Sequence, residues 1–295
     1  MDRRAFLVAG GAGLVSTSAW AAMRKVGAPH PPLTDPLHDA IARIEAESGG
    51  RLGVALHDTG TGRRFAYRGD ERFAMCSTFK LLLAGAVLAR VQRRVERLDR
   101  RVPVHGSDVI GHAPFTGKRA GGSATVAELC RAMVVESDNG AANLMLAAIG
   151  GPAALTRFLR QAGDPVTRLD RTEPSLNEAA PGDPRDTTTP LAMLGSAGRL
   201  WLGPVLAPAH RAQLTAWTIE CRTGRERLRA GLPKGWRAGD KTGTGDRGTF
   251  NDVAIFWPPR RGPVLVTSYL SESKLDTDAG NAVHAKVARA LASMI

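Results

Sequence analysis

Cysteine, aromatic residues and long apolar runs are all scarce in this sequence of 295 residues. Its three cysteines, Cys76, Cys130 and Cys221, cannot all pair, and none has the spacing of a metal ligand. We expect them to be small buried hydrophobic side chains, although a disulfide between two of them stays open. Aromatic residues make up only 5% of the chain. These shortages exclude a disulfide-stapled miniprotein and a zinc finger, and we expect neither a metal nor a cofactor.

Positive charge is the most unusual property that the sequence does have. Lysine and arginine number 40 against 28 aspartates and glutamates, which gives a net charge of +12. The plain interpretation is a cationic surface; the alternative is attraction to an anionic partner such as nucleic acid or an envelope polymer. The charge is scattered, and its densest run is residues 90–101, where six of twelve are arginine. Positive charge is the only feature that favours nucleic-acid binding, and no other signal of it is present in the sequence. We therefore expect no nucleic-acid partner.

The N-terminus resembles an export signal. Arginines at positions 3 and 4 precede Phe6, Leu7 and a short apolar stretch rich in glycine and alanine, as in a twin-arginine (Tat) signal. Ala-Trp-Ala at 19–21 would be the cleavage site, so residues 1–21 are predicted to be removed. The stretch is too short and glycine-rich to span about 30 Å of hydrocarbon, and we expect no stable membrane association. The predicted location is the periplasm, or outside the cell if there is no outer membrane.

Strand-like segments lie at both ends of the chain, and helix-like segments fill its middle. Strands are expected at 51–58, 63–68, 236–242, 252–257 and 263–270, and helices at 37–47, capped by Asp35, and at 279–294. From 77 to 219 the pattern is helical, with loops at 107–122 and 171–186. The predicted fold class is α/β (α+β): an antiparallel sheet flanked by helices, from residues 22–75 and 220–295, with an inserted all-helical domain at 76–219. A cleft between the two would hold a ligand.

A Ser-x-x-Lys motif from Ser77 to Lys80 is the first arrangement that could do chemistry. Positions i and i+3 share one face of a helix, so the Lys80 ammonium can lie beside the Ser77 hydroxyl. Serine needs such a neighbour to become a nucleophile. A second copy, Ser271 to Lys274, shows that the motif alone is a weak signal. That copy runs into a surface-like loop, whereas Ser77 opens the most apolar helix in the chain, which would hold its side chain rigidly.

Two further tripeptides carry polar side chains at expected element boundaries. Ser-Asp-Asn at 137–139 separates two helical runs, and taken alone it is a helix cap. We expect Asp138 to brace its own loop through backbone N–H groups. Lys-Thr-Gly at 241–243 ends an expected strand, and taken alone its glycine indicates a turn. The functional interpretation is that the lysine and threonine face a substrate carboxylate, while Gly243 lets a ligand approach the backbone.

The order of these motifs resembles that of the class A serine β-lactamases. The sequence also has Glu-Pro-Ser-Leu-Asn at 173–177, where that family carries a Glu-x-x-Leu-Asn loop. Arg171 and Asp186 bracket this segment and resemble the ion pair that closes the family's Ω-loop. The resemblance extends over nearly the whole chain that would follow the signal. It implies the fold shared by serine β-lactamases and penicillin-binding proteins, with β-lactam antibiotics as substrates.

The resemblance implies the catalytic roles. Ser77 would be the nucleophile, Ser137 would relay a proton to the ring nitrogen, and Glu173 with Asn177 would activate the water that deacylates the enzyme. The base for acylation stays open between neutral Lys80 and Glu173 acting through a water. We favour Glu173, because lowering a lysine pKa from about 10.4 to about 7 costs roughly 4–5 kcal/mol. We also predict that the peptide bond after Glu173 is cis, which would turn the carboxylate inward.

Substrate-binding residues follow from the same resemblance. The backbone N–H groups of Ser77 and Thr244 would form the oxyanion hole. Lys241, Thr242 and Thr244 would hold the substrate carboxylate. Asn139 would contact the acylamide side chain of the substrate and also Lys80.

Two positions depart from the family's common disulfides. Ala84 excludes the bridge that many members make to the position of Cys130. Cys76 resembles the carbapenem-hydrolysing members, in which it is bridged to a cysteine near the third motif. Gly245 stands in that region here, so this bridge should be absent.

His112 and Arg227 complete the predicted substrate contacts. His112 falls where the family often has an aromatic gate, so it would stack on the substrate. The alternative interpretation is that His112 is an ordinary loop residue. The arginine that many members place after the third motif is missing, with Phe250 near that position. Arg227 resembles the substitute arginine of other members, and its alternative is a surface arginine.

Two other functions stay open on the sequence. A penicillin-binding DD-peptidase or transpeptidase would share the nucleophile but lack the deacylating glutamate, so Glu173 and Asn177 argue against it. A non-catalytic cationic binding protein would explain the charge but leave four ordered motifs unexplained; its binding would weaken steeply with salt and survive Ser77→Ala. We expect a monomer, because no exposed apolar helix stands out.

Overall fold

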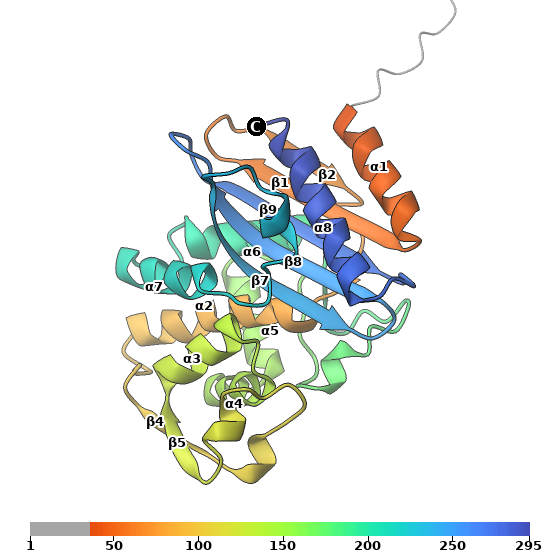
Figure 1. Cartoon of the computed structure of the whole chain (residues 1–295). Helices are drawn as coiled ribbons and strands as arrows, with labels where there is room; N and C mark the ends of the chain where they lie inside the picture. The colour runs from red at the N-terminus through yellow and green to blue at the C-terminus, as the bar shows by residue number, and fades with distance from the viewer. Residues whose placement is uncertain (1–35) are drawn as a thin grey trace, which may run out of the picture. The chain divides into compact units, whose positions relative to one another are not determined.

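A five-stranded antiparallel sheet lies at the centre of the fold (Figure 1). The computed structural model describes residues 36–295; the predicted signal at 1–21 and the predicted cap Asp35 lie outside them. The two ends of the chain build this one sheet, as the sequence predicted, and β1 pairs with β9 along its whole length. In spatial order the strands are β2 (Arg64–Tyr67), β1 (Arg51–Asp58), β9 (Val264–Ser271), β8 (Thr249–Trp257) and β7 (Arg237–Gly245).

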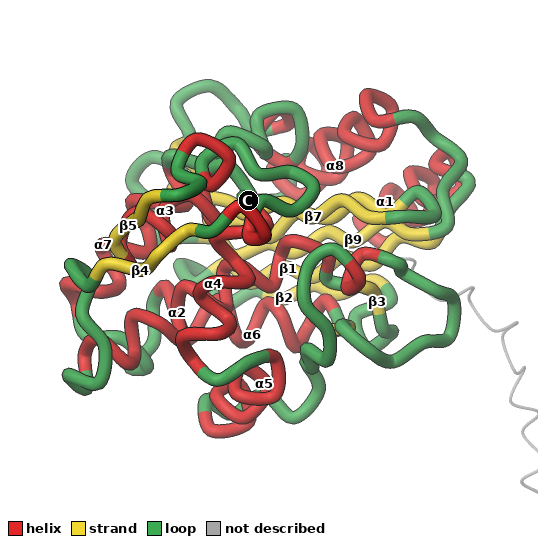
Figure 2. Tube along the Cα trace, turned by 90° about the horizontal axis from the view of Figure 1, so that it is seen from below, coloured by secondary structure: helices red, strands yellow, loops and turns green. Residues whose placement is uncertain are grey.

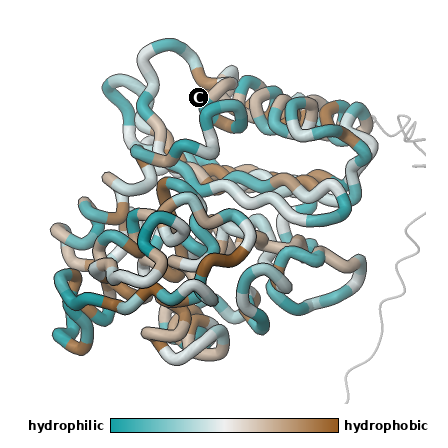
Figure 3. Tube along the Cα trace, turned by 60° about the horizontal axis from the view of Figure 1, so that its bottom comes forward, coloured by the Kyte–Doolittle hydropathy of each residue, from teal (hydrophilic) through white to brown (hydrophobic). Residues whose placement is uncertain are grey.

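Helices cover both faces of this sheet (Figures 1 and 3). Helices α1 (Pro36–Ser48) and α8 (Thr277–Ala292) pack on one face, and helices from the middle of the chain pack on the other. Strand β9 contributes Val266 and Leu270 to the core under α1 and α8. It contributes Leu265 and Tyr269 to the core under the helices from the middle of the chain. Successive strand residues point to opposite faces, so a strand covered on both faces is apolar at most positions.

Six helices come from the middle of the chain, and the other five surround α2 (Figure 2). They are α2 (Phe79–Gln92), α3 (Val126–Val135), α4 (Asn139–Ile149), α5 (Pro152–Gln161), α6 (Pro190–Trp201) and α7 (Pro208–Ile219). Every residue of α2 from Phe79 to Ala89 is buried, and Lys80 is the one charged residue among them. A helix that is apolar all round belongs in a core. The packing therefore fixes the start of α2 rigidly.

The antiparallel sheet with flanking helices confirms the predicted fold class, but the middle of the chain is not helical throughout. Strands β4 (Arg101–Val104) and β5 (Gly122–Thr125) form a hairpin, and β3 (Phe73–Ala74) pairs with β6 (Thr187–Thr188). The prediction of helices and loops alone over this region was wrong. Each strand has at most four residues, and Pro103 and Gly122 weaken the local strand pattern. The domain boundaries at 75/76 and 219/220 stay predictions.

Within residues 36–295, no single helix combines the length and the apolar character needed to cross a membrane. Helices α4 and α5 reach that length and composition only as a pair, bent by 68° at the break between them. In the same part of the chain, no three histidine, cysteine, aspartate or glutamate side chains are grouped as metal ligands.

Candidate active site

Ser77 lies in the short 3-10 turn, Cys76–Thr78, that leads into α2. Strand β7 packs directly against this turn. A methyl group added to Gly243 would lie 2.6 Å from the Met75 carbonyl oxygen and 3.2 Å from the Ser77 nitrogen. The sequence assigned Gly243 to the approach of a ligand, but the close approach in the structure is that of β7 to the backbone of the predicted nucleophile. It brings the Ser77 N–H beside the strand that carries Thr244.

The Lys80 ammonium connects three of the sequence motifs. Its Nζ donates to Ser77 Oγ at 2.8 Å, to Asn139 Oδ1 at 2.7 Å and to the Ser137 carbonyl oxygen at 2.8 Å. It also lies 2.9 Å from Glu173 Oε1, and both of these charged side chains are fully buried. Burial lowers the pKa of Lys80, while the negative charge of Glu173 opposes that shift. One nitrogen on α2 thus contacts residues from the 3-10 turn before that helix, from α4 and from two loops.

Glu173 is held through both its side chain and its backbone. Asn177 Nδ2 donates to Glu173 Oε2 at 2.5 Å, and Glu173 Oε1 lies 3.4 Å from Ser77 Oγ. Asn143, on α4, donates to the Glu173 carbonyl oxygen at 2.9 Å and accepts from the Glu173 N–H at 3.0 Å. The Glu173–Pro174 peptide bond is cis, which confirms that prediction. The carboxylate therefore has a fixed place beside Ser77.

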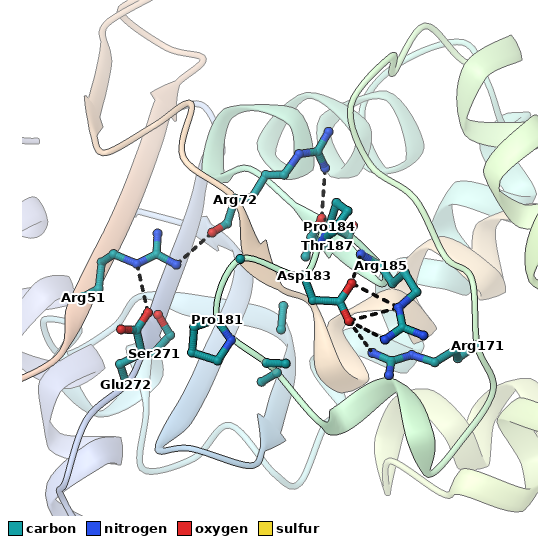
Figure 4. A pocket seen from close by; sticks show the side chains of 14 residues that line it. Arg51, Arg72, Arg171, Pro181, Asp183, Pro184, Arg185, Thr187, Ser271 and Glu272 are labelled. Atoms are coloured by element: carbon teal, nitrogen blue, oxygen red, sulfur yellow. Dashed lines mark hydrogen bonds and ion pairs between the residues drawn. The ribbon is translucent and has the colours of Figure 1, made fainter.

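The loop that carries Glu173 is closed by the ion pair that the sequence predicted. Arg171 Nε donates to Asp186 Oδ2 at 2.5 Å, and Asp186 Oδ1 accepts from the N–H groups of Asp170 and Arg171. Figure 4 shows the outer rim of this loop, where Arg171 and Arg185 both point toward Asp183. The Asp186 side chain is buried, so these charge-assisted bonds fix the base of the loop.

Lys241, on β7, faces Ser137. Its Nζ lies 3.1 Å from Ser137 Oγ and donates to the Thr242 carbonyl oxygen at 2.8 Å. The side chain is fully buried, and burial lowers the pKa of Lys241 to about 8. Two ammonium groups therefore approach Ser137: Lys241 contacts its hydroxyl, and Lys80 contacts its carbonyl oxygen.

Arg227 is not a surface arginine, because only 4% of it is exposed. Its Nη1 donates to the carbonyl oxygens of Gly243 and Asn251, both at 2.6 Å. Its Nη2 donates to Thr244 Oγ1, also at 2.6 Å. Arg227 therefore holds the end of β7 from behind and positions the Thr244 hydroxyl.

These side chains surround an open cavity of about 240 Å³. Lys80, Glu173 and Lys241 lie beneath its wall, each in contact with a residue that lines it. Eight of the nine lining residues were predicted from the sequence, and Thr223 is the exception. The lining residues are Ser77, His112, Ser137, Asn139, Asn177, Thr223, Arg227, Thr242 and Thr244.

Two residues next to the reactive groups have a left-handed backbone, which non-glycine residues rarely adopt. Cys76 has a φ of 44° and Ser137 a φ of 60°. Such a conformation costs on the order of 1–3 kcal/mol and persists only where the surroundings impose it. Asp138 supplies part of that constraint, because it accepts from the Thr116 N–H at 2.9 Å and caps α4 through the Ala141 N–H at 2.8 Å. The capping role is present, but the other backbone N–H groups that Asp138 braces are those of Phe115 and Thr116, in a different loop from the one the sequence predicted.

The three cysteines are buried and free. Burial raises the pKa of the Cys76 thiol, so this neighbour of Ser77 stays protonated. Gly245 is in the region where a bridging cysteine was considered, and a methyl group there would lie 2.5 Å from Cys76 Sγ. The two positions are thus in contact without a bridge.

Two polar residues of the site were missed by the sequence analysis. Asn143 follows Asn139 by four residues on α4, so the two share a helix face, and that spacing was the available signal. Thr223 lies in the turn after α7, and its Oγ1 is 2.5 Å from Thr242 Oγ1. No local pattern marks Thr223, because its role depends on a contact with β7.

Comparisons with known proteins identify relatives over most of the chain. The model of the Beta-lactamase enzyme family matches residues 36–295. The chain is 49% identical to β-lactamase L2 of Stenotrophomonas maltophilia over 250 residues, which are 84% of this chain and 82% of that protein. An ancestral class A β-lactamase, GNCA, has a TM-score of 0.87 at 60% identity and covers 88% of this chain and 100% of its own. The putative class A β-lactamase PenP from Rhodopseudomonas palustris has the same TM-score and coverages at 54% identity.

Proposed function

Because this chain belongs to the class A serine β-lactamases, we propose that it hydrolyses β-lactams through an acyl-enzyme on Ser77 that a Glu173-activated water deacylates. Hydrolysis of β-lactams, and with it resistance, is the activity of the family. The main support for this mechanism is the mutual contact of Ser77, Lys80 and Glu173 at the cavity. Ser77 Oγ lines the open cavity, lies 2.8 Å from the buried Lys80 and faces the buried Glu173 at 3.4 Å. A nucleophile, a cation and a base are thus in mutual contact.

Acylation begins with attack of Ser77 Oγ on the ring carbonyl carbon. The hydroxyl proton passes to Glu173, directly or through a water, while Lys80 stays cationic and donates to Oγ. The developing oxyanion accepts from the N–H groups of Ser77 and Thr244. As the C–N bond breaks, Ser137 gives its proton to the ring nitrogen, and the adjacent Lys241 stabilises the alkoxide. The proton that Glu173 took from Ser77 then passes on, by way of the neighbouring Lys80, to Ser137, so the serine hydroxyl and the Glu173 carboxylate are both restored before deacylation.

Deacylation uses the same carboxylate in a second step. A water between Glu173 and Asn177 gives a proton to Glu173 and attacks the acyl carbon. The bond between Ser77 Oγ and the acyl carbon breaks, and Ser77 Oγ takes the proton that Glu173 received from the water, which restores the carboxylate. A penicillin-binding enzyme lacks this deacylating carboxylate and stays acylated. Glu173 is therefore the residue that allows the reaction to turn over.

The acyl-enzyme can be trapped directly. Wild-type protein is mixed with benzylpenicillin, quenched in acid within milliseconds, digested and mapped by mass spectrometry. We expect a penicilloyl group on the peptide that contains Ser77, with complete turnover of the drug in an unquenched sample. An adduct on another residue would contradict the assignment of the nucleophile, and a lasting stoichiometric adduct without turnover would indicate a penicillin-binding enzyme.

The substrate carboxylate would bind at the end of β7. Thr242 and Thr244 present hydroxyls to the cavity, Lys241 supplies the charge beneath them, and Arg227 holds Thr244. Asn139 and His112 also line the cavity, and the acylamide side chain would lie against them. Arg227 thus acts in part as a positioning residue, through Thr244 and the Gly243 carbonyl.

The Lys241 anchor predicts a loss of kcat/KM at alkaline pH. The pKa of Lys241 is about 8, so its ammonium is present below that pH and is lost as the pH rises through it. We expect kcat/KM to fall about fivefold between pH 8 and pH 9, mainly through KM, because a neutral lysine no longer attracts the carboxylate. In Lys241→Arg the charge is kept and this alkaline limb should disappear. Lys118→Arg, an exposed lysine, is the control; an unchanged limb in Lys241→Arg would assign the titration elsewhere.

We also propose that the protein is exported by its twin-arginine signal to the periplasm and acts there as a monomer. The two arginines at positions 3 and 4 and the Ala-Trp-Ala at 19–21 support this proposal. Intact mass of the protein from a periplasmic extract should correspond to a chain that begins at residue 22. A mature chain that retains the arginines would contradict it.

A further inference from the structure

Two adjoining cavities between α2 and α5, away from the active site, gather positive charge. The two helices lie side by side (Figures 1 and 2). The first cavity, of about 180 Å³, is lined by Arg90, Arg93 and Arg157, and no acidic residue lines it. None of these arginines forms an ion pair with a carboxylate of residues 36–295. Arg90 and Arg93 open the arginine-rich run 90–101 that the sequence analysis left without a role.

The cavity behind the Ω-loop shows what a neutralised arginine cluster looks like (Figure 4). It is lined by four arginines, of which three have carboxylate partners: Arg51 pairs with Glu272, Arg185 with Asp183 and Arg171 with Asp186. The fourth, Arg72, donates to the Val166 carbonyl oxygen and the Thr187 hydroxyl. At the α2–α5 cavity, the ion pair of Glu96 is with Arg100, which lowers the pKa of Glu96, and the charge of Arg90 contributes to that shift. Three like charges therefore line one cavity, and no carboxylate of residues 36–295 is within ion-pair distance of them, an arrangement that an anion would stabilise.

The donors of these arginines are free to bind such an anion. Arg90 Nε has no hydrogen-bond partner but is itself covered, so the terminal nitrogens of Arg90, which make no hydrogen bond within residues 36–295, would meet the anion. Arg93 uses its Nε on the carbonyl oxygen of Ala89, at the end of its own helix, which leaves its two terminal nitrogens. Guanidinium groups bind planar and tetrahedral oxyanions with paired N–H donors, so the natural ligand group is a phosphate or a carboxylate.

The second cavity adds an apolar site next to this charge. Its volume is about 210 Å³, and it shares Arg93, Phe158 and Gln161 with the first cavity. Its other walls are mainly the small apolar side chains Ala89, Ala162 and Val205. A single ligand can therefore place an anionic group among the arginines and an apolar chain alongside Phe158.

We propose that the α2–α5 groove, defined by Arg90, Arg93, Arg157, Phe158 and Val205, binds an anionic phospholipid. Its phosphodiester contacts the arginines, and an acyl chain lies in the apolar cavity. No residue of the groove lines the active-site cavity, so this binding is independent of the proposed reaction. The groove also gives part of the net charge of +12 a specific role.

The test uses short-chain lipids below their micellar concentration, with isothermal titration calorimetry as the readout. The probes are dihexanoyl phosphatidylglycerol, the zwitterionic dihexanoyl phosphatidylcholine and inorganic phosphate. The variant Arg90→Gln/Arg93→Gln/Arg157→Gln is compared with Arg43→Gln/Arg260→Gln/Arg289→Gln, which removes the same charge from three arginines outside the groove. β-Lactam hydrolysis by each variant verifies that it is folded.

We expect phosphatidylglycerol to bind more tightly than the other two probes, and binding to weaken at least tenfold in the groove variant but not in the control variant. Val205→Asp should weaken phosphatidylglycerol binding while the three arginines remain.

Equal binding of phosphate and phosphatidylglycerol would overturn the acyl-chain site. Equal losses in the two triple variants would reduce the effect to net charge, and no binding of phosphatidylglycerol at low salt would overturn the proposal. If the triple variant fails to hydrolyse β-lactams, Arg157→Gln alone gives the same decision.

Discussion

Glu173→Gln is expected to convert the enzyme into one that acylates and then stays acylated. The substituted glutamine side chain would occupy the same volume and keep a contact to Asn177, but an amide cannot accept a proton from the attacking water. General-base assistance is typically worth about 10²–10⁴ in rate, so deacylation should slow by about that factor. Intact-protein mass spectrometry after brief exposure to benzylpenicillin should show a stable adduct on Ser77 in the variant and free enzyme in the wild type.

Acylation should survive this substitution because of Lys80. In the wild type, burial lowers the pKa of Lys80 and the Glu173 charge, with Oε1 at 2.9 Å, opposes that shift. Removing the charge takes away the largest contribution that opposes burial, although the Asp138 charge remains, so a larger fraction of Lys80 is neutral at pH 7. A neutral amine 2.8 Å from Ser77 Oγ can take the hydroxyl proton itself. The two candidate bases are thus coupled: loss of one makes the other a better base.

Glu178→Gln is the matched control for this experiment. Glu178 is a carboxylate of the same loop, is exposed and pairs with Arg171 at 2.6 Å. This variant should turn the drug over like the wild type. Normal turnover by Glu173→Gln would show that another group activates the water. A variant that neither turns over nor forms an adduct would show that Glu173 is indispensable for acylation as well.

Each short motif is a weak signal alone, but their order resembles that of the class A family, and this resemblance indicated residues that the structure brings together around one cavity. Ser77 and Lys80 are three residues apart at the start of an all-apolar helix, and the packing of α2 in the core then fixes their positions. Strand β9 was readily predicted from the sequence. Because helices cover both faces of the sheet at this strand, its residues form an almost continuous apolar run. Motif residues that lie close together in the sequence, and segments that are buried along their whole length, could thus be assigned without coordinates.

The rest depends on pairings between distant segments, which no local pattern records. Arg227 could be taken for a surface side chain until β7 was placed against it, since its partners are carbonyl oxygens of Gly243 and Asn251. Thr223 enters the site only through Thr242. The strand at Arg101–Val104 forms because Gly122–Thr125 lies beside it. In each case the determinant is a tertiary contact that outweighs a weak or neutral propensity.

Lys80→Met is expected to abolish acylation, with a loss of about 10³–10⁴ in its rate. The Lys80 ammonium donates to Ser77 Oγ, which leaves the serine's own proton free to point at Glu173 Oε1, 3.4 Å away. The substituted methionine side chain would fill a similar volume but could neither orient that hydroxyl nor balance the charge that passes to Glu173. Stopped-flow measurement with benzylpenicillin should show no burst, and mass spectrometry no adduct. Lys118→Met, at an exposed lysine, is the control.

The double variant Lys80→Met/Glu173→Gln separates a chemical role of Lys80 from a structural one. Lys80→Met alone leaves the buried Glu173 carboxylate without its cation, and breaking a buried pair from one side typically costs about 3–5 kcal/mol of stability. The double variant removes both charges, so much of that stability should return. Acylation should not return, because the neutral amine that rescues Glu173→Gln is absent. An adduct on the double variant, formed as fast as on Glu173→Gln, would show that Lys80 is not the alternative base. Recovered stability without an adduct would place Lys80 in the proton transfer itself.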